Sequence, residues 1–558
     1  MPHPGEPKGA RAIRRGRCFF AGTDRRDNAR ISMMETEMTE KILNKAKAGV
    51  ETCDLCIIGA GAAGLNALFV ASQYLRKTDK VILIERRDAP GGMWNDVYDY
   101  ARLHQPHPAF TVGDMDWNWS KPKDYLATGA EVETHLTRCY EATRDKLDLV
   151  ELFGHTVTAC DEFVTENGAA ARVECHPNNA SGQTRVIEAK RVIRATGFDV
   201  HVAEPLAFSS TKVVSTTPER LSGAVGFDSD TPVFVVGGGK TGMDTAYNLL
   251  TRGPGRAVTL INGKGSVFAK REKYFPRAGR RWMSGTLIAD LFREQAMLFN
   301  GTNEDACFYH LRRNSTVSVG GNNENFFYGI LSSEERDVIA SGLDGIVKDY
   351  LADVVDGPDG PEMVFGNGAH RPVPEGSAFV NCTGHLLRHS HAYEPYISAG
   401  GAVVAITPRS MVHFLSTVSA YFLTHLFFRG KLQDLPLYEF DGEAIIAKNA
   451  RLYHMSLICL SFMNLLIMMR ALPLSVFNRC GLDLDRLYPL HRRAIALIDM
   501  KLNGRGYVAH CMKALDRMRN VQGVRCGPLA VTTKLAASES DRAPGDTHQS
   551  NEEIARAA

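Results

Sequence analysis

Two stretches of the chain combine a short apolar run rich in β-branched residues, a glycine-rich turn and a helical pattern of apolar positions. The first run occupies 53–58 and the second 232–236. Strands that alternate with helices in this manner predict βαβ units, in which parallel strands form the sheet. Because the pattern occurs twice, the sequence predicts two nucleotide-binding domains.

Apolar periodicity is missing at both ends of the chain. The first 32 residues carry eight Lys or Arg against three Asp or Glu, and the residues from about 536 onward are polar. Such segments bury too little apolar surface to offset the entropy of ordering the chain. We therefore expect 1–50 to be a disordered or weakly structured extension and 536–558 to be a disordered tail.

Two long apolar runs lie in the C-terminal third. Residues 411–428 and 452–469 are each 18 residues long without Asp, Glu, Lys or Arg, which is close to the length that crosses a bilayer. Both runs contain His together with other polar residues, so they are poor spans. We expect a buried helix in the first, and in the second a docking helix with peripheral membrane contact as an open alternative. The region 446–535 is predicted to be mainly helical.

The composition of the chain excludes some classes of function. The chain has 558 residues with 44% apolar and 23% charged residues, so it is expected to fold into several globular domains. Its net charge of only +2 gives no global attraction to nucleic acid or to an anionic surface. The 12 Cys are scattered, mostly within apolar runs, and indicate reduced thiols in a cytoplasmic protein, with membrane association left open.

The first glycine-rich turn has the spacing of a dinucleotide-binding loop. Gly59 permits a tight turn, Gly61 lets the backbone approach a pyrophosphate, and Gly64 lets the helix pack closely on the sheet. The N-terminus of the helix supplies N–H groups and partial positive charge to the phosphates. Glu85 ends the next predicted strand, where its carboxylate can accept hydrogen bonds from ribose hydroxyls.

The second turn repeats this spacing with Gly237, Gly239 and Gly242. Its following strand ends in Asn262, and Lys264 stands two residues further on, so no carboxylate is present there. A carboxylate would repel a 2′-phosphate, whereas Asn with a nearby Lys can bind it. The second loop is therefore predicted to bind NADPH.

Other patterns are discounted. The cluster of His385, His389 and His391 has no Cys or carboxylate at ligand spacing, so no metal site is expected. The stretch 270–282 mixes basic and aromatic residues, but it follows the strand of the second nucleotide site in a nearly neutral chain. Phosphate contact or a solvated surface is favoured there over nucleic-acid binding.

Past the first loop, Gly91-Gly92-Met93-Trp94 precedes a Tyr-Asp-Tyr-Ala-Arg segment. Here the chain resembles flavin-dependent monooxygenases, the superfamily of Baeyer-Villiger and N- or S-oxygenating enzymes. The resemblance implies that FAD is held by the first loop together with Gly92 and Trp94. It also places His104 and Gln105 near the isoalloxazine ring, as the candidate catalytic residues.

Two further strands end in Thr-Gly, at Thr196-Gly197 and at Thr383-Gly384. In the resembling flavoproteins, such strands end beside a cofactor. The fold expected from the resemblance is α/β, with two Rossmann-like domains, the NADPH domain inserted into the FAD domain. The expected boundaries are 51–210 and 377–445 for the FAD-binding domain, and 211–376 for the NAD(P)H-binding domain.

One motif of the superfamily is missing. Members usually carry Phe-x-Gly-x-x-x-His-x-x-x-(Trp/Tyr) before the second loop, but the stretch 208–216 keeps Phe208 and lacks the Gly and the His. The leading hypothesis is an NADPH-dependent FAD monooxygenase acting on a small molecule with O2. The alternatives are a flavoprotein reductase without oxygen insertion, and a non-catalytic redox sensor that binds both nucleotides. A disulfide reductase would need a redox pair, and Cys53 and Cys56 lie on a predicted strand that would hold them apart.

Overall fold

A computed structural model describes residues 49–179, 182–198, 203–221, 230–321, 323–384 and 391–540. The predictions for 1–48 and 541–558, and those for His385 and His389, lie outside the described residues. Within the described part, Thr52 and the residues after it form one compact unit, which the chain enters through β1 (Val50–Cys53).

The first parallel sheet carries the first glycine loop. Its strand order is β20-β8-β2-β3-β4, and all neighbouring pairs are parallel. Its central strand β2 is fully buried, because both faces of a parallel sheet are covered. Helix α2 (Ala62–Ala71) follows β2 directly and packs against α11 (Ser416–Phe428). The strands are β2 (Leu55–Ile58), β3 (Lys80–Ile84), β4 (Asp148–Leu152), β8 (Val192–Arg194) and β20 (Val403–Ala405).

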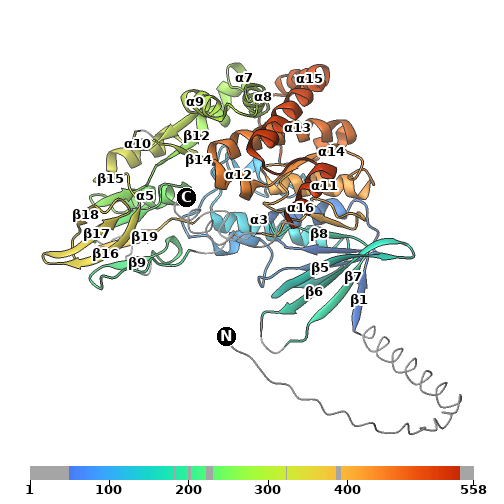
Figure 1. The fold of residues 1–558 in the computed structure, drawn as a ribbon, viewed down its shortest axis with the longest axis horizontal. Coiled ribbons are helices and arrows are strands. Elements are labelled where there is room, and N and C mark those ends of the chain that lie inside the picture. Colours follow the sequence, from blue (N-terminus) through green and yellow to red (C-terminus); the bar gives the residue numbers. More distant parts are fainter. Residues whose placement is uncertain are drawn as a thin grey trace, which may run out of the picture. The chain divides into compact units, whose positions relative to one another are not determined.

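The second parallel sheet carries the second glycine loop and has the order β15-β11-β10-β19-β9. Its strands β15, β19 and β9 are labelled in Figure 1. Strand β19 pairs in parallel with both β10 and β9. Residues 378–381 therefore belong to this sheet, and the predicted return to the FAD-binding domain at 377 was placed too early. The chain returns to the first sheet at β20, which pairs in parallel with β8. The strands are β9 (Val214–Thr216), β10 (Val233–Val236), β11 (Val258–Ile261), β15 (Gly345–Val347) and β19 (Ala378–Asn381).

Smaller sheets are added to both domains. Antiparallel β5 (His155–Thr165), β6 (Gly168–Pro177) and β7 (Arg185–Ala189) join the FAD side. The NADPH side gains two sheets, and a short antiparallel pair lies in the C-terminal region. These strands are β12 (Ser266–Lys270), β13 (Thr316–Ser318), β14 (Asn325–Leu331), β16 (Leu351–Gly357), β17 (Gly360–Phe365), β18 (His370–Pro372), β21 (Tyr438–Phe440) and β22 (Cys526–Pro528).

Helices fill the rest of both domains and dominate after residue 441, as predicted. Short 3-10 turns are η1 (Gly92–Asp96), η2 (His107–Ala109) and η3 (Pro218–Arg220). The other helices are α3 (Gly129–Arg144), α5 (Lys240–Arg252), α6 (Arg271–Tyr274), α7 (Ala278–Met283), α8 (Ile288–Leu298), α9 (Glu304–Ser315), α10 (Ser333–Gly342), α12 (Gly442–Lys448), α13 (Ala450–Ala471), α14 (Leu474–Asn478), α15 (Leu490–Gln522) and α16 (Leu529–Ser540).

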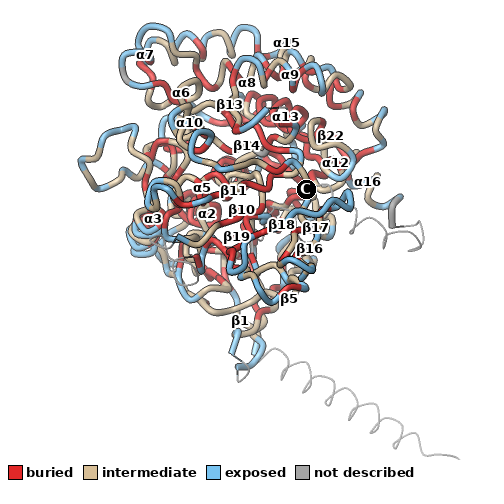
Figure 2. The backbone as a smooth tube through the Cα atoms, turned by 90° about the vertical axis from the view of Figure 1, so that its left-hand side faces the viewer, coloured by how far each residue is buried: buried red, intermediate tan, exposed pale blue. Residues whose placement is uncertain are grey.

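Helix α13 is an interior helix. Asn449 caps its N-terminus by accepting hydrogen bonds from the N–H groups of Arg451 and Leu452. It is long and apolar enough to cross a membrane, but 89% of its apolar window is buried inside the fold, as Figure 2 shows in red. It packs against α8, α9 and α15. The membrane contact predicted through 452–469 would need an exposed apolar face, which this helix does not have.

Two other boundaries differ from the sequence-based expectation. Helix α16 continues to Ser540, so residues 536–540 of the predicted tail are helical. Helix α11 begins at Ser416 rather than near 411, because Met411 pairs with Phe440 in a β-bridge. Residues 411–415 therefore form a loop between β20 and α11.

Candidate active site

The first glycine loop lies where the strand order of its sheet reverses, between β2 and β8. Gly59 adopts a φ of +100°, and a Cβ there would lie 2.7 Å from the carbonyl oxygen of Ala195. A Cβ on Gly64 would lie 1.8 Å from the carbonyl oxygen of Gly59. Both positions therefore exclude any side chain. Such a switch point, outside the carboxyl ends of the strands, is where open α/β sheets bind ligands.

The Gly-Gly segment lies directly over this loop. The N–H of Gly91 donates to the carbonyl of Ala60 at 2.9 Å. A Cβ on Gly92 would lie 2.7 Å from Cα of Gly61, which caps the N-terminus of α2. Trp94 follows in η1, and its ring meets Phe110 edge-on at 5.6 Å between centroids. The fold thus brings together Gly61, Gly92 and Trp94, which the sequence separates.

Glu85 is buried, with 4% of its surface exposed, and it closes the same loop. Its Oε2 accepts the N–H of Ala60 at 2.7 Å, and its Oε1 accepts the N–H of Arg87 at 2.9 Å. Each carboxylate oxygen can accept a second hydrogen bond. The structure therefore gives Glu85 a loop-holding role that the sequence did not reveal, and it leaves acceptor capacity for ribose hydroxyls.

The second loop has the same geometry at the switch point between β10 and β19. Gly237 has a φ of +119°, and a Cβ there would lie 2.7 Å from the carbonyl oxygen of Cys382. A Cβ on Gly242 would lie 2.0 Å from the carbonyl oxygen of Gly237. Gly239 caps α5 and has no atom within 4 Å of its would-be Cβ. The open space at Gly239 is where a pyrophosphate has room to approach the helix N-terminus.

Asn262 and Lys264 follow β11 beside this loop. A Cβ on Gly238 would lie 2.8 Å from Cβ of Asn262. Asn262 is 7% exposed, and its buried Oδ1 has no hydrogen-bond partner among the described residues. Lys264 is exposed at the turn, so its ammonium is available to a phosphate. An unsatisfied buried oxygen is costly, which fits a site that a polar ligand completes.

Each Thr-Gly segment follows a strand that ends beside one of the glycine loops. Thr196 and Gly197 follow β8 and Ala195, the residue that lies against Gly59. Gly197 adopts a φ of +65°. Thr383 and Gly384 follow β19 beside Gly237. The N–H and the hydroxyl of Thr383 both donate to Oδ1 of Asn381, at 3.1 and 2.5 Å, which fixes the turn.

His104 lies near the start of the second loop's helix. Its carbonyl accepts from Nε of Arg271 at 3.0 Å, and its Nδ1 accepts the N–H of Ile330 at 3.4 Å. Burial, together with the charges of Lys240 and Arg271, lowers the pKa of His104 to about 3. The imidazole is therefore neutral at physiological pH and suits hydrogen bonding rather than proton transfer.

Gln105 is the second residue predicted to be catalytic. Its Oε1 is buried without a partner among the described residues. Like Asn262, it is therefore a polar group that a ligand can satisfy.

A cavity at the carboxyl ends of β8 and β20 involves a segment that sequence reasoning did not assign. It is partly open to solvent and is lined by Gly197 and by the loop that follows β20, including Thr407, Ser410 and His413. His413 is 7% exposed, and burial lowers its pKa to about 3. The only sequence signal was a His within an otherwise apolar run.

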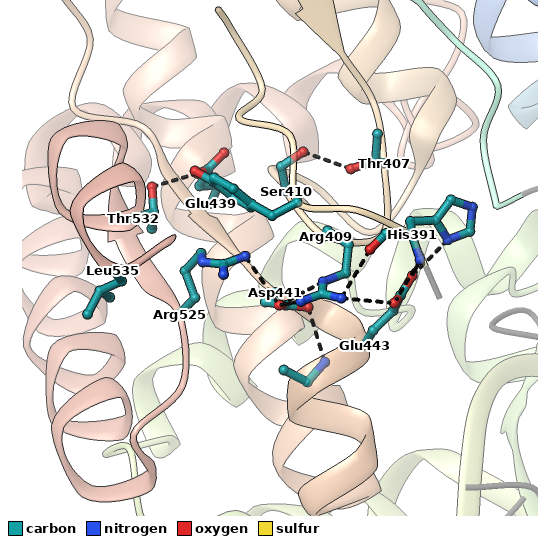
Figure 3. Close-up of polar contacts among 12 residues, drawn as sticks. His391, Thr407, Arg409, Ser410, Glu439, Asp441, Glu443, Arg525, Thr532 and Leu535 are labelled. Carbon is teal, nitrogen blue, oxygen red and sulfur yellow. Dashed lines mark hydrogen bonds and ion pairs between the residues drawn. The ribbon is translucent and has the colours of Figure 1, made fainter. Parts of the chain in front are cut away.

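A buried ionic network positions this loop (Figure 3). Arg409 pairs with Asp441 at 2.7 Å and donates to the carbonyl of His391 at 3.0 Å. Asp441 also accepts from the N–H of Ala444 at 3.1 Å, which caps α12. His391, which was discounted as a metal ligand, pairs with Glu443 at 2.7 Å. No group of His, Cys, Asp or Glu among the described residues is arranged to hold a metal ion.

The stretch 208–216 is structural rather than part of the site. The Phe208 ring packs edge-on against Phe379 at 5.0 Å between centroids. The hydroxyls of Ser209 and Ser210 donate to Asp353 and Asp356, each at 2.6 Å. The segment that replaces the missing signature therefore anchors β16 to the NADPH-side sheet.

The family model for pyridine nucleotide-disulphide oxidoreductases matches residues 53–287, which is less than half of the chain. Among curated proteins, uncharacterized proteins of Mycobacterium bovis and Mycobacterium tuberculosis are 38% identical over 63 residues. That match covers 11% of this chain and 11% of each relative.

Several solved structures are similar to part of this chain. A flavin-containing monooxygenase from Stenotrophomonas maltophilia is 15% identical, with 68% of this chain and 99% of that chain covered and a TM-score of 0.39. Cyclohexanone monooxygenase from Rhodococcus sp. Phi1, bound to NADP+, is 14% identical, with 71% and 87% covered and a TM-score of 0.43. Bacillithiol disulfide reductase from Bacillus cereus is 13% identical, with 69% and 100% covered and a TM-score of 0.38.

The family model and the two glycine loops at their switch points both indicate a dinucleotide-binding oxidoreductase. The structure has two Rossmann-like domains, and residues 53–287 are similar to pyridine nucleotide-disulphide oxidoreductases.

Proposed function

We propose that this oxidoreductase is a monooxygenase that reduces FAD with NADPH and oxygenates a small organic substrate with O2. The observation that carries the proposal is the pair of equivalent loops at two switch points, with a cavity beside the first. When bound, FAD supplies electron transfer from NADPH and the activation of O2.

The chain's own residues tie the two loops together. The Tyr98 hydroxyl donates to Asp244 at 3.0 Å, and the hydroxyls of Tyr100 and Thr245 are 2.9 Å apart. Asp244 and Thr245 lie on α5, directly after the second loop, whereas Tyr98 and Tyr100 follow the Gly-Gly segment of the first. These contacts fix the FAD-side chain against the helix that would bind NADPH, which orients one cofactor toward the other.

The cavity beside the first loop has a partly apolar wall and contains no charged side chain. Ile406, Met411 and Val412 contribute apolar wall to the cavity, and the neutral His413 and the hydroxyls of Thr407 and Ser410 add polar edges without a charge. A dry pocket protects reactive oxygen chemistry from hydrolysis. Such a cavity supports oxygen insertion over simple electron transfer.

A disulfide reductase fits less well. Among the cysteines of the described residues, Cys160 is the only one that is not buried. Cys53 ends β1 and Cys56 lies in β2, and burial raises the pKa of Cys56 well above its usual value. A buried thiol with a raised pKa is a poor nucleophile. A reductase of quinones or of a partner protein remains the alternative, and the cytoplasmic location stays a prediction.

Flavin absorbance near 450 nm tests the proposal. The purified protein is expected to bind FAD, to bleach when NADPH is added without air, and to consume O2 with product oxygenation when air and substrate are added. Bleaching followed by reoxidation without any oxygenated product, across a broad substrate panel, would favour the reductase. No NADPH oxidation by FAD-loaded protein would leave only the redox sensor.

A further inference from the structure

Large apolar side chains are exposed on two neighbouring helices, α7 and α15. Trp282 and Met283 lie at the end of α7, and Ile495, Ile498 and Leu502 lie in the first half of α15. All five residues are more than half exposed, and Met283 is the most exposed of them at 82%. We call these five residues the α7–α15 patch. Exposed apolar residues that gather in one place mark an interaction surface.

Helix α15 has two different sides. Ala496 and Gly504 are buried on the side that faces the rest of the fold. Ile495, Ile498 and Leu502 are three and four residues apart, so they follow one another along the solvent-exposed side. That side of a helix normally carries polar residues, and beyond residue 510 the exposed positions of α15 are mostly polar. The exposed aliphatic residues are therefore concentrated in the half of α15 that adjoins α7.

Contacts between the two helices fix them beside each other. Nη1 of Arg492 donates to the carbonyl of Arg281 at 2.9 Å, and the ring centroids of Trp282 and His491 are 5.9 Å apart. His491 lies four residues before Ile495, so Trp282 meets the same side of α15 that carries the aliphatic residues. Both helices lie at the upper edge of Figures 1 and 2. The apolar residues of α7 and α15 therefore belong to one surface.

Four basic residues around the α7–α15 patch face solvent. They are Arg277, Arg280, Lys501 and Arg505. Arg281 is not among them, because it is 7% exposed and its Nε donates to the carbonyl of Pro276. Arg493 is partly buried and pairs with Asp483 at 2.6 Å, so its charge is compensated within the fold.

Acidic groups near the α7–α15 patch are few and already paired. Asp499 is the only Asp or Glu in segments 277–284 and 490–506, and it pairs with Arg293 of α8. Asp124 lies 4.0 Å from Arg277, where both side chains are largely exposed. An exposed pair at that distance compensates little charge. The surroundings of the patch are therefore positive.

This combination of apolar and basic residues favours one class of partner. A second copy docked through the same surface would bring the bases of both copies together, because a twofold interface places the same surface on itself. A nucleic acid would leave the aliphatic residues without partners, since bases stack on aromatic rings. Protein surfaces that lie in the interface of an anionic membrane combine apolar side chains with Lys and Arg, and Trp is enriched there.

From this charge complementarity we propose that the α7–α15 patch docks on the surface of an anionic lipid bilayer. The five apolar side chains would enter the headgroup region, and the four bases would contact lipid phosphates. The protein would lie on the bilayer without spanning it, and α13 would stay in the interior. Docking does not depend on the chemistry at the flavin, so it goes beyond the proposed function.

Cosedimentation of the full chain with lipid vesicles tests the docking. The protein is expected to bind vesicles of 3:1 phosphatidylcholine and phosphatidylglycerol, with at least about tenfold weaker binding to phosphatidylcholine alone. Each base near an anionic surface strengthens binding about fivefold, so Lys501→Gln with Arg505→Gln should weaken binding to the mixed vesicles about 5- to 25-fold. Binding that is independent of the anionic lipid would overturn the proposal, as would no binding at all.

A triple variant, Ile495→Gln, Ile498→Gln and Leu502→Gln, tests the apolar contribution. Gln favours helix at least as well as Ile, so α15 should be retained, which a thermal unfolding curve checks. Binding to the mixed vesicles is expected to weaken at least about tenfold. The matched control replaces three residues outside the patch by Gln, each also more than half exposed, namely Val164, Leu474 and Val521. Equal binding by the triple variant and the control would contradict the proposal.

Fluorescence of Trp282 reports whether this surface is the one that meets the lipid. Mixed vesicles that contain brominated phosphatidylcholine should quench part of the Trp fluorescence, and Trp282→Phe should remove that quenching while the protein still sediments. Quenching that persists in Trp282→Phe would overturn the assignment to the α7–α15 patch. So would a wild-type dimer in solution that the triple Gln variant converts to a monomer, since the patch then joins two copies.

Discussion

The substitution Gly239→Ala separates folding from NADPH binding at the second loop. Gly239 has φ of −78° and ψ of −174°, which any residue adopts, and nothing lies within 4 Å of an added Cβ. The free energy of unfolding should therefore change by less than about 1 kcal/mol, because alanine reduces the entropy of the unfolded chain but is a poorer N-cap than glycine. By contrast, Gly242→Ala places a Cβ 2.0 Å from a backbone oxygen and should destabilise the fold.

The same methyl group would occupy the space that a pyrophosphate needs. Loss of one charge-assisted hydrogen bond from the loop costs about 1.5–3 kcal/mol, which corresponds to a Kd for NADPH raised about 10- to 150-fold. The assay is anaerobic stopped-flow reduction of the flavin at 450 nm over a range of NADPH concentrations, together with a thermal unfolding curve. An unchanged Kd in a stable Gly239→Ala protein would refute the assignment of this loop to NADPH.

Three further outcomes are expected. Glu85→Gln leaves one of the N–H groups of Ala60 and Arg87 without an acceptor, so unfolding should cost about 1–3 kcal/mol less and FAD content after gel filtration should fall; unchanged flavin retention would contradict the role of Glu85. Burial raises the pKa of Asp485 to about 7, so the folded state holds its proton more tightly than the unfolded chain and stability is lost as pH rises from about 4 to about 7. The Tm of Asp485→Asn relative to wild type should therefore increase between pH 5 and pH 8, by the equivalent of about 4 kcal/mol at most, and a constant difference would argue against it. Arg409→Met leaves the buried Asp441 with a weaker cation partner, and it should destabilise the protein by about 3 kcal/mol in chemical denaturation, more than Arg76→Met at an exposed pair.

Local chemistry was enough to find the cofactor loops. Gly59 and Gly237 need a positive φ, and Gly64 and Gly242 need close backbone contact, so glycine spacing alone marked both turns. The buried parallel strands that precede them are short apolar runs of the expected length. These features depend on neighbours within a few residues, which is why they can be recognised along the chain.

The partners of each loop depended on tertiary structure. The fold sets Gly59 against Ala195 and Gly237 against Cys382, and it lays Gly92 over Gly61. It also assigned β19 to the NADPH-side sheet, because two Thr-Gly strands of similar composition differ only in the strand with which they pair.

The C-terminal region shows the same limit. An apolar run such as 452–469 has one composition whether it lies in a bilayer or in a core, and only packing against α8, α9 and α15 made α13 an interior helix. The cavity wall at His413 and the exposed face of α15 arise from the same packing. The sequence by itself determined the two glycine loops, since their geometry is local. The cavity lined by His413 and the exposed face of α15 were decided by contacts between residues far apart in the chain.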